Sequence, residues 1–434
     1  MPFSAEYIKG LPWLGLTTQA AKDSYGFFQK MSLRNSAAQR FVLAGKSYLN
    51  INHPDLLKYV MHTHQKNFVK GAETKEWAHV LGAGLIVANG PEWLKQRRAA
   101  QPLFQKKAMD EHIKVIHQRA ELLAKRWLRK EQVSVFKSLN HLSLDIVMES
   151  LFAEDFDSRK SKVSHWIDEI LTHLYPRITG VNPFPYSWPV LGNLKIKRPL
   201  KQLDQWIISI IQKRKENGPK STDNLLDRYL FPPDGEMPFS DQLVRDELVT
   251  FLIAGHETVA VSMGWFFYCY LSQPEKAQIL NDELAACNYD PNNAYLKAFC
   301  EEVLRLYPAG WILSRKAIST DRWENVTIEP TDHITIPLAA LHRHPGYWEH
   351  ASVFMPERFL EGKIIPQNVY FPFGKGPRAC IGDQMAMHEM TITTATILKY
   401  CKLSPISVNP GLNPQVTLKP QKDIIIFANP NSRL

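Results

Sequence analysis

Hydrophobic positions recur every three or four residues along much of the chain, as in a helix with one buried face. This spacing is found in segments 105–175, 201–217, 275–287 and 292–307. A fifth segment, 240–273, is apolar on nearly all sides and follows Ser240, a residue type that caps helix N-termini. It predicts one long helix in the core. The pattern therefore indicates a mainly α protein.

Short β-prone runs occupy the rest of the chain. Residues 40–52 place two such runs around Gly45-Lys46-Ser47 and predict a hairpin, and segments 312–340 and 403–428 predict further short strands. The proline-rich segment 176–199 interrupts the helical pattern. It predicts a structured apolar loop, either a packed connection or a lid over an apolar cavity. Because no linker or repeat divides the chain, we expect a single domain over residues 1–434.

Composition and charge narrow the classes of protein further. The chain has 434 residues, of which 44% are hydrophobic and 22% charged, so it is neither fibrous nor disordered. A net charge of +9 over this length favours acidic partners but is too small to indicate nucleic-acid binding. The five cysteines include no C-x-x-C pair. We therefore expect a reducing compartment rather than a disulfide framework.

Two apolar segments could be mistaken for membrane elements. The N-terminal one is interrupted by Glu6, Lys9 and Pro12, which argues against a signal peptide or an anchor. The other, from Leu248 onward, contains Glu257, and the uncharged part after it is shorter than the roughly 20 residues that span a bilayer. The sequence thus predicts a cytoplasmic protein without a transmembrane anchor.

The most informative segment runs from Phe373 to Gly382 and contains Cys380. Glycines and a proline before the cysteine predict a tight turn, and a helical run follows it. Free N–H groups at a helix start favour a thiolate, and Gly382 leaves room for a large flat group beside the sulfur. A buried structural cysteine and a nucleophile paired with a histidine base are the alternatives to a ligand role.

The spacing F-x-x-G-x-R-x-C-x-G occurs here as Phe373, Gly376, Arg378, Cys380 and Gly382. It resembles the haem-binding signature of the cytochrome P450 family at all five fixed positions. The resemblance implies that Cys380 is the axial thiolate of a haem b iron, with Phe373, Arg378 and Gly382 as cofactor-binding residues. It also implies a helical prism with a small β-rich region, matching the family over about residues 40–428 and leaving 1–39 as an N-terminal segment.

Two further elements occur in the family's order. Glu302-Val-Leu-Arg305 places an acid and a base on one helix face, which by itself is an ordinary ion pair. It resembles the E-x-x-R element of the family, and Pro356-Glu357-Arg358-Phe359 resembles the P-E-R-F element. The resemblance implies that Glu302, Arg305 and Arg358 interlock behind the haem in a structural role.

The segment Ala254-Gly255-His256-Glu257-Thr258 lies within the long apolar helix. Ala254 and Thr258 are four residues apart, so the hydroxyl can bond to the Ala254 carbonyl and open the helix locally. A simple helix bend is the alternative. The segment resembles the family's A-G-x-E-T oxygen-activation element, which implies that Glu257 and Thr258 form the catalytic proton-delivery pair and that Ala254 contacts the cofactor.

Trp93 and Arg97 are also four residues apart and share one helix face. Their alternative interpretation is an amphipathic helix with a basic edge. They resemble the family's W-x-x-x-R helix, which implies that both bind a haem propionate, and Arg315 lies where the family often has another propionate ligand. Positions that match the family's substrate contacts include Leu85, Ile86, Val87, Ala309, Trp311, Ile312 and Leu313.

The resemblance implies a monooxygenase that inserts one atom of O2 into a hydrophobic small molecule such as a fatty acid, terpenoid or steroid-like compound. Electrons would come from a ferredoxin or flavodoxin docked on basic residues near the cysteine: Lys95, Arg97, Arg98, Lys106, Lys107 and Lys375. A peroxide-driven haem-thiolate hydroxylase and a non-oxygenating haem protein are alternatives. A zinc site is another, because His62-x-His64 and His342-x-His344 have ligand-like spacing.

Overall fold

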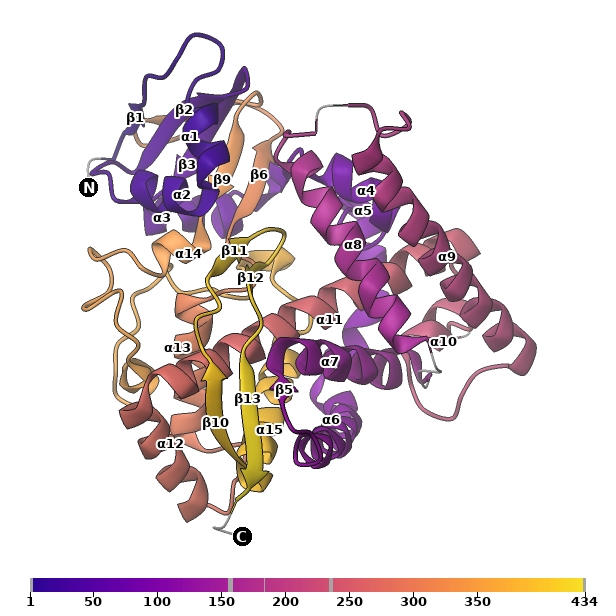
Figure 1. Ribbon diagram of the computed structural model, residues 1–434. Coiled ribbons are helices and arrows are strands. Elements are labelled where there is room, and N and C mark those ends of the chain that lie inside the picture. The colour runs from indigo at the N-terminus through magenta and orange to yellow at the C-terminus, as the bar shows by residue number, and fades with distance from the viewer. Residues whose placement is uncertain (1–2, 155–158, 183, 234–236, 432–434) are drawn as a thin grey trace.

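The computed structural model describes residues 3–154, 159–182, 184–233 and 237–431. Helices form most of the molecule, and a small sheet lies at one corner of it (Figure 1). This confirms a mainly α fold with a small β-rich region. The helices are α1 (Thr17–Lys22), α2 (Ser24–Ser32), α3 (Pro54–Lys58), α4 (Thr74–Leu81), α5 (Gly90–Ala100), α6 (Lys106–Trp127), α7 (Val135–Phe152), α8 (Lys160–Ile178), α9 (Leu191–Asn217), α10 (Leu225–Leu230), α11 (Asp241–Ser272), α12 (Pro274–Ala286), α13 (Ala294–Leu306), α14 (Leu338–Leu341) and α15 (Asp383–Tyr400).

The largest sheet joins the N-terminal region to the segment after α13. Its strands, in spatial order, are β1 (Ala5–Tyr7), β2 (Ala38–Leu43), β3 (Lys46–Ile51), β9 (His333–Ile336), β6 (Leu313–Ala317) and β4 (Phe68–Lys70). The smaller sheets pair β10 (Cys401–Ser407), β13 (Ile425–Pro430) and β5 (Val133–Ser134); β11 (Leu412–Pro414) and β12 (Leu418–Pro420); and β7 (Asp321–Trp323) and β8 (Val326–Ile328).

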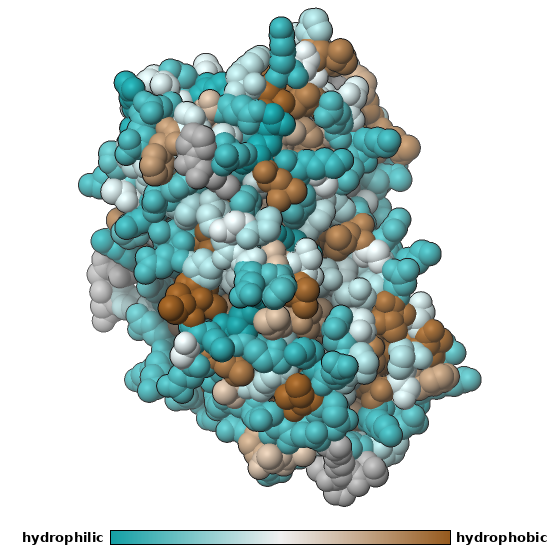
Figure 2. Space-filling view, turned by 90° about the vertical axis from the view of Figure 1, so that its left-hand side faces the viewer, coloured by the Kyte–Doolittle hydropathy of each residue, from teal (hydrophilic) through white to brown (hydrophobic). Residues whose placement is uncertain are grey.

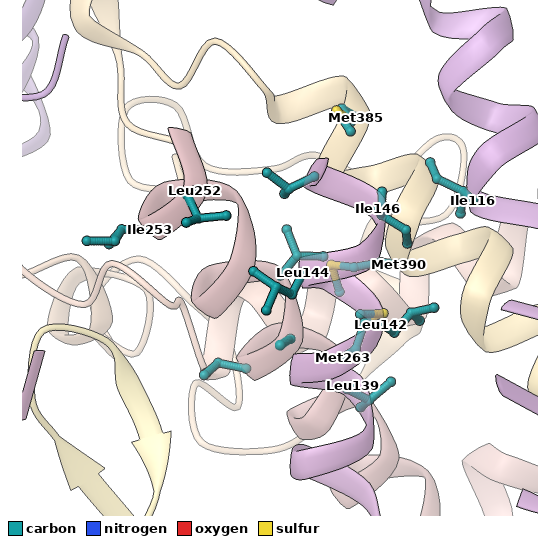
Figure 3. Packing of buried hydrophobic residues seen from close by; sticks show 14 of the residues in the cluster. Ile116, Leu139, Leu142, Leu144, Ile146, Leu252, Ile253, Met263, Met385 and Met390 are labelled. Carbon is teal, nitrogen blue, oxygen red and sulfur yellow. The ribbon is translucent and has the colours of Figure 1, made fainter. Parts of the chain in front are cut away.

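Helix α11 runs through the middle of the molecule and packs against α7 (Figure 1). Buried side chains of α6, α7, α11 and α15 interlock around this contact (Figure 3). A Cβ added at Gly255 would lie 2.7 Å from Val147, and one at Gly264 would lie 1.9 Å from the Phe136 ring. Both glycines are therefore needed for the close approach of the two helices.

The start of α11 follows the prediction, because the Ser240 side chain accepts a hydrogen bond from the Leu243 N–H. Within the described part of the chain, α11 is the helix that is long and apolar enough to cross a membrane. However, 83% of its most apolar window is buried inside the protein. Burial on all sides therefore explains its composition.

Two sequence predictions need correction. The break predicted over 176–199 is shorter, since α8 continues through Pro176 and α9 begins at Leu191 and contains Pro199. Pro199 is buried in α9, so packing outweighs the lost backbone hydrogen bond. The 40–52 hairpin is confirmed, but its turn is Ala44-Gly45 rather than Gly45-Lys46-Ser47. Both turn residues have positive φ, as a two-residue hairpin turn of type I′ requires.

The face on the N-terminal side is mostly polar, and its apolar residues occur in separate groups rather than one continuous patch (Figure 2). The helices and the small sheet of β5, β10 and β13 share a large cluster of buried residues that extends along the chain from Val80 to Ala428. This framework holds the segments that carry the site.

Candidate active site

The loop before α15 forms the tight turn that the sequence predicts around Cys380. The Ala379 N–H donates to the Gly376 carbonyl at 2.9 Å, and the Cys380 N–H donates to the Phe373 carbonyl at 2.8 Å. Gly376 has a φ of +75°, and an added Cβ would lie 2.1 Å from the Met61 carbonyl oxygen. The turn thus requires glycine there, and it fixes the direction of the cysteine.

The Cys380 thiol is accessible although protein surrounds it. Burial raises the pKa of this thiol, and the Gly382 N–H and Arg97 oppose the increase by stabilising the thiolate. Nevertheless the residue is exposed by surface area, whereas Cys269, Cys300 and Cys401 are buried. An exposed residue that protein surrounds borders space that the described side chains do not fill. At Gly382 an added Cβ would meet only Phe104, at 3.5 Å, so packing does not explain this glycine.

Helix α11 exposes one short stretch of an otherwise buried surface. Between Val244 and Phe267 every residue is buried except Ala254, Gly255 and Thr258. The Thr258 hydroxyl donates to the Ala254 carbonyl at 2.7 Å, as the spacing predicts. An accessible hydroxyl therefore lies within the apolar core. Gly255 is nonetheless explained by its contact with α7, not by a ligand.

Glu257 points elsewhere than its neighbour Thr258. Its Oε1 accepts a hydrogen bond from Lys419 Nζ at 2.9 Å, and its side chain is 4% exposed. The predicted pair is adjacent in the chain, but the carboxylate is held by a lysine of β12. Sequence reasoning missed Lys419, which lies 162 residues from its partner.

Four cations gather beside the cysteine turn: Lys70, Arg97, Arg315 and Arg378. Arg97 donates to the Ala379 carbonyl at 3.0 Å, and Arg378 stacks on the Trp93 ring at 3.8 Å. None of the four forms an ion pair with a carboxylate of the described residues. The structure thereby brings together Trp93, Arg97, Arg315 and Arg378, all of which the sequence analysis selected, and adds Lys70.

The strand register places two of these cations face to face. Lys70 of β4 is the direct partner of Arg315 of β6, and like charges in that arrangement destabilise a sheet. Burial and the charges of Arg378 and Arg315 lower the pKa of Lys70 to about 7, although the charges of Glu247 and Glu73 act in the opposite direction. Burial, Arg315 and Arg97 lower the pKa of Arg378 to about 10. A group of partly buried cations that form no ion pair with a described carboxylate is suited to a ligand that carries more than one negative charge.

Behind the turn, Glu302, Arg305 and Arg358 interlock as expected. Both Glu302 and Arg305 are fully buried and paired at 2.7 Å, and Arg358 Nε donates to Glu302 at 3.2 Å. Arg305 also donates to the carbonyls of His342 and Ala351, each at 2.7 Å. The cluster ties α13 to the loop that leads to Cys380.

The histidine pairs do not support a zinc site. Among the described residues, no three His, Cys, Asp or Glu side chains are grouped as metal ligands. His64 stacks on Tyr59, while His342 accepts from the Phe371 N–H and His344 from the Gly346 N–H. These histidines are structural.

The predicted substrate contacts fall into two groups. Ile86, Val87, Ile312 and Leu313 are partly exposed, whereas Leu85 and Ala309 are 8% exposed. Trp311 is buried against the N-terminal helices and donates from its indole to the Gln415 carbonyl at 2.8 Å. Trp311 thus connects the N-terminal helices to the segment around Gln415, and it does not act as a substrate contact.

Comparison with known proteins agrees with this geometry. The model of the family described as cytochrome P450 matches residues 7–427. The chain belongs to the cytochrome P450 family. It is therefore a monooxygenase that uses haem, O2, an organic substrate and a redox partner. Within the family it is similar to several curated proteins, all at modest identity.

Three relatives illustrate the range. The chain is 28% identical to Protein LUTEIN DEFICIENT 5, chloroplastic, of Arabidopsis thaliana over 83% of its own length and 66% of that protein. It is 28% identical to Putative cytochrome P450 132 of Mycobacterium tuberculosis, covering 91% of this chain and 90% of the relative. It is also 28% identical to the Arabidopsis thaliana Cytokinin hydroxylase, over 86% of this chain and 79% of the relative.

The residues present fit a haem. Cys380 is an exposed residue, the four cations form no ion pair with a described carboxylate, and Gly382 leaves its Cβ position open on the protein side. A porphyrin with two propionates matches each of these features. The sequence analysis selected Cys380, Gly382 and the cations beside them except Lys70, whose position depends on strand pairing.

Proposed function

We propose that this P450 holds haem b between the Cys380 turn and the accessible stretch of α11. Cys380 would bind the iron, and Lys70, Arg315 and Arg378 would bind the propionates together with Trp93 and Arg97. Phe373, Ala254 and Gly382 would flank the macrocycle. The observation that carries the proposal is the accessible Cys380 sulfur beside a group of cations that lack carboxylate partners.

The bound haem would supply the redox chemistry, in which one atom of O2 enters the substrate and the other leaves as water, using two electrons and two protons. The chain's own contribution at the metal is electronic. The Cys380 thiolate would donate electron density to iron, and the Gly382 N–H and Arg97, which stabilise the thiolate, would moderate that donation.

Thr258 and Glu257 would supply the protons. Thr258 is partly exposed, and its hydroxyl, oriented by the Ala254 carbonyl, can bind a water or oxygen-bearing group. Glu257 is the adjacent acid and can exchange protons with water that reaches α11. Apolar residues around this point keep other water away, which strengthens each hydrogen bond.

The substrate is proposed to be a hydrophobic small molecule of the fatty-acid, terpenoid or steroid-like class. Partly exposed Ile86, Val87, Ile312 and Leu313 offer apolar contacts in the segments that flank the cation group. Such a lining favours apolar ligands by removing their surface from water.

The electron donor is proposed to be a separate ferredoxin or flavodoxin, in a cytoplasmic setting. Lys95 and Arg98 are exposed on α5, the helix whose Arg97 contacts the cysteine turn, and Lys106 and Lys107 are exposed at the start of α6. An acidic partner would associate with these residues through complementary charge.

A ligand screen tests the proposal most directly. Holoprotein is titrated with fatty acids, terpenoids and steroids, and a low-to-high spin change in the haem spectrum identifies binders. Turnover of a binder with reductant and O2 is then compared with turnover with hydrogen peroxide. We expect the first to exceed the second; activity with peroxide alone would instead indicate a peroxide-driven hydroxylase, and activity with neither a non-oxygenating protein.

Replacing Thr258 with alanine is expected to uncouple electron use from product formation. The variant loses the accessible hydroxyl while α11 keeps its fold, so reductant is consumed but more of it appears as hydrogen peroxide. General acid–base groups contribute about 10²-fold or more, so the product yield per electron should fall severalfold at least. Product and peroxide are measured together, and Thr258→Ser is the control. Unchanged coupling in Thr258→Ala would contradict the role.

Replacing Arg315 with glutamine is expected to speed haem loss about tenfold. A charge-assisted hydrogen bond contributes about 1.5–3 kcal/mol, and 1.4 kcal/mol is a factor of ten. The rate of haem transfer to excess apomyoglobin measures the effect. Arg322→Gln is the matched control, because Arg322 is the exposed residue of β7. Equal rates in the two variants would remove Arg315 from the propionate site.

A further inference from the structure

Asn89 and Gly90 form an exposed Asn-Gly pair at the start of α5. An asparagine before a glycine loses ammonia readily, because glycine has no side chain to hinder attack of its backbone nitrogen on the asparagine amide. A Cβ added at Gly90 would meet nothing within 4 Å, and Gly90 has a φ of +58°. Among the described residues, the Gly90 N–H has no backbone acceptor outside its helix. The Gly90 nitrogen is therefore unhindered.

Arg378 holds the Asn89 amide in place. Its Nη1 donates to the Ala88 carbonyl at 3.1 Å, and its Nη2 donates to Asn89 Oδ1 at 3.3 Å. The guanidinium lies over the Trp93 ring at 3.8 Å, and Asn89 Nδ2 donates to the Val87 carbonyl at 3.2 Å. A fixed cation at a carbonyl oxygen stabilises the negative charge that develops there when a nucleophile adds to the carbon. Arg378 is thus placed to promote attack on the Asn89 amide.

We propose that Asn89-Gly90 is a self-modification site, in which Arg378 promotes conversion of Asn89 to aspartate or isoaspartate and the product carboxylate weakens haem binding. The Gly90 nitrogen forms a bond to Asn89 Cγ, the Cγ–Nδ2 bond breaks, and ammonia leaves with the proton of the Gly90 N–H. Water then opens the resulting imide ring at either of its carbonyls. The effect on haem rests on the proposed function, whereas the conversion itself does not.

The product brings a negative charge to the group of cations. Burial and the charges of Arg315 and Arg97 lower the pKa of Arg378 to about 10, so Arg378 lies where an added carboxylate is favoured. A carboxylate at position 89 would pair with Arg378, compete with a haem propionate for it and repel the charge of that propionate. Isoaspartate also lengthens the main chain between α5 and the segment before it. Both products therefore favour release of haem.

A second Asn-Gly-Pro sequence, Asn217-Gly218-Pro219, provides an internal control. Asn217 is also exposed, and a Cβ added at Gly218 would meet nothing within 4 Å. However, Asn217 is the last residue of α9 and has helical backbone, whereas Asn89 precedes α5 and is extended. The Arg378 contact is made by Asn89 alone of the two. The pairs share their local sequence and differ in their surroundings.

Peptide mass mapping of aged holoprotein tests the conversion. The holoprotein is incubated at neutral pH, and the aspartate and isoaspartate peptides of each site are separated and quantified. We expect Asn89 to convert roughly tenfold faster than Asn217, less than the effect of a fully buried oxyanion donor because Arg378 is partly exposed. After unfolding in urea the two rates should be similar. An Asn89 rate equal to or below that of Asn217 in the folded protein would overturn the proposal.

Arg378→Leu separates the effect of the guanidinium from that of the backbone. The variant lacks both hydrogen bonds, so conversion of Asn89 should slow severalfold while the rate at Asn217 stays the same. An unchanged Asn217 rate also shows that the variant is folded, since unfolding would release Asn217 from its helix. Arg322→Leu, at the exposed residue of β7, is the control and should change neither rate. Conversion of Asn89 at the wild-type rate in Arg378→Leu would refute the promoting role.

Haem transfer to excess apomyoglobin tests the consequence. Asn89→Asp should release haem about two- to fivefold faster than the wild type, the range for a partly exposed ion pair, whereas Asn217→Asp should not. Aged wild type should gain a fast phase whose amplitude equals the converted fraction of Asn89. Asn89→Ser cannot lose ammonia and should not change with ageing. Equal rates in Asn89→Asp and Asn217→Asp would overturn the effect on haem.

The mapping result is independent of the proposed function, because mass mapping requires no substrate, reductant or redox partner. An absence of monooxygenase turnover would therefore contradict the proposed function and leave the conversion standing. An unconverted Asn89 in aged protein would do the reverse.

Discussion

Cys380→Ala is expected to abolish the haem-thiolate character of the protein. Without the sulfur no other cysteine can replace it, since Cys269, Cys300 and Cys401 are buried and the partly exposed Cys287 contacts the Leu284 carbonyl instead of the cation group. The reduced carbon-monoxide difference spectrum should lose the form that thiolate ligation produces. Monooxygenase activity should fall by more than about 100-fold, the upper range for removing a residue that only supports a metal ligand.

Cys287→Ala is the control for Cys380→Ala, because Cys287 is a partly exposed cysteine that contacts the Leu284 carbonyl rather than the cation group. It should retain the wild-type spectrum. A wild-type spectrum in Cys380→Ala, measured on folded protein that has been loaded with hemin, would remove the basis of the site.

Arg305→Met is expected to produce the largest loss of stability. The substitution keeps an unbranched apolar stem but removes the guanidinium, and it leaves the buried Glu302 carboxylate with only the Met355 N–H and Arg358. It also removes the donor to the carbonyls of His342 and Ala351. Removing one partner of a buried ion pair costs about 3–5 kcal/mol. Urea unfolding, followed by circular dichroism, measures the change.

The control for Arg305→Met is Lys114→Met. It removes an ion pair with Glu111 that has the same three-residue spacing as the pair of Arg305 with Glu302. Both of these side chains are more than 60% exposed, so the urea midpoint should stay close to that of the wild type. If Arg305→Met unfolded at the same urea concentration as Lys114→Met, the interlocking cluster would have no stabilising role.

The sequence predicted those parts of the site that depend on short-range spacing. The turn at Cys380, the pair Glu302 and Arg305, and the bond from Thr258 to Ala254 each join residues within seven positions, so glycine geometry and helical periodicity suffice. The Ser240 cap and the 40–52 hairpin are local for the same reason. Each of these features is present in the structure.

The parts that the sequence did not predict depend on long-range pairing. Lys70 meets Arg315 only because β4 is the edge strand beside β6, and Lys419 meets Glu257 across 162 positions. No local pattern marks either lysine. Pro176 and Pro199 led to a wrong prediction, because proline has a low helix propensity and each was expected to end a helix. Tertiary packing keeps both residues inside helices, Pro176 in α8 and Pro199 in α9.

The pairing of β4 with β6, which places Lys70 opposite Arg315, has a consequence for the abundance of this protein in a cell. A newly made chain must bring these two cations together before the negatively charged propionates of a haem can compensate them. The protein without haem is therefore expected to be less stable than the protein with haem. Ligand binding to the folded state alone raises stability by mass action. Cells short of porphyrin should therefore accumulate less of this polypeptide, because proteases remove the unloaded chain first.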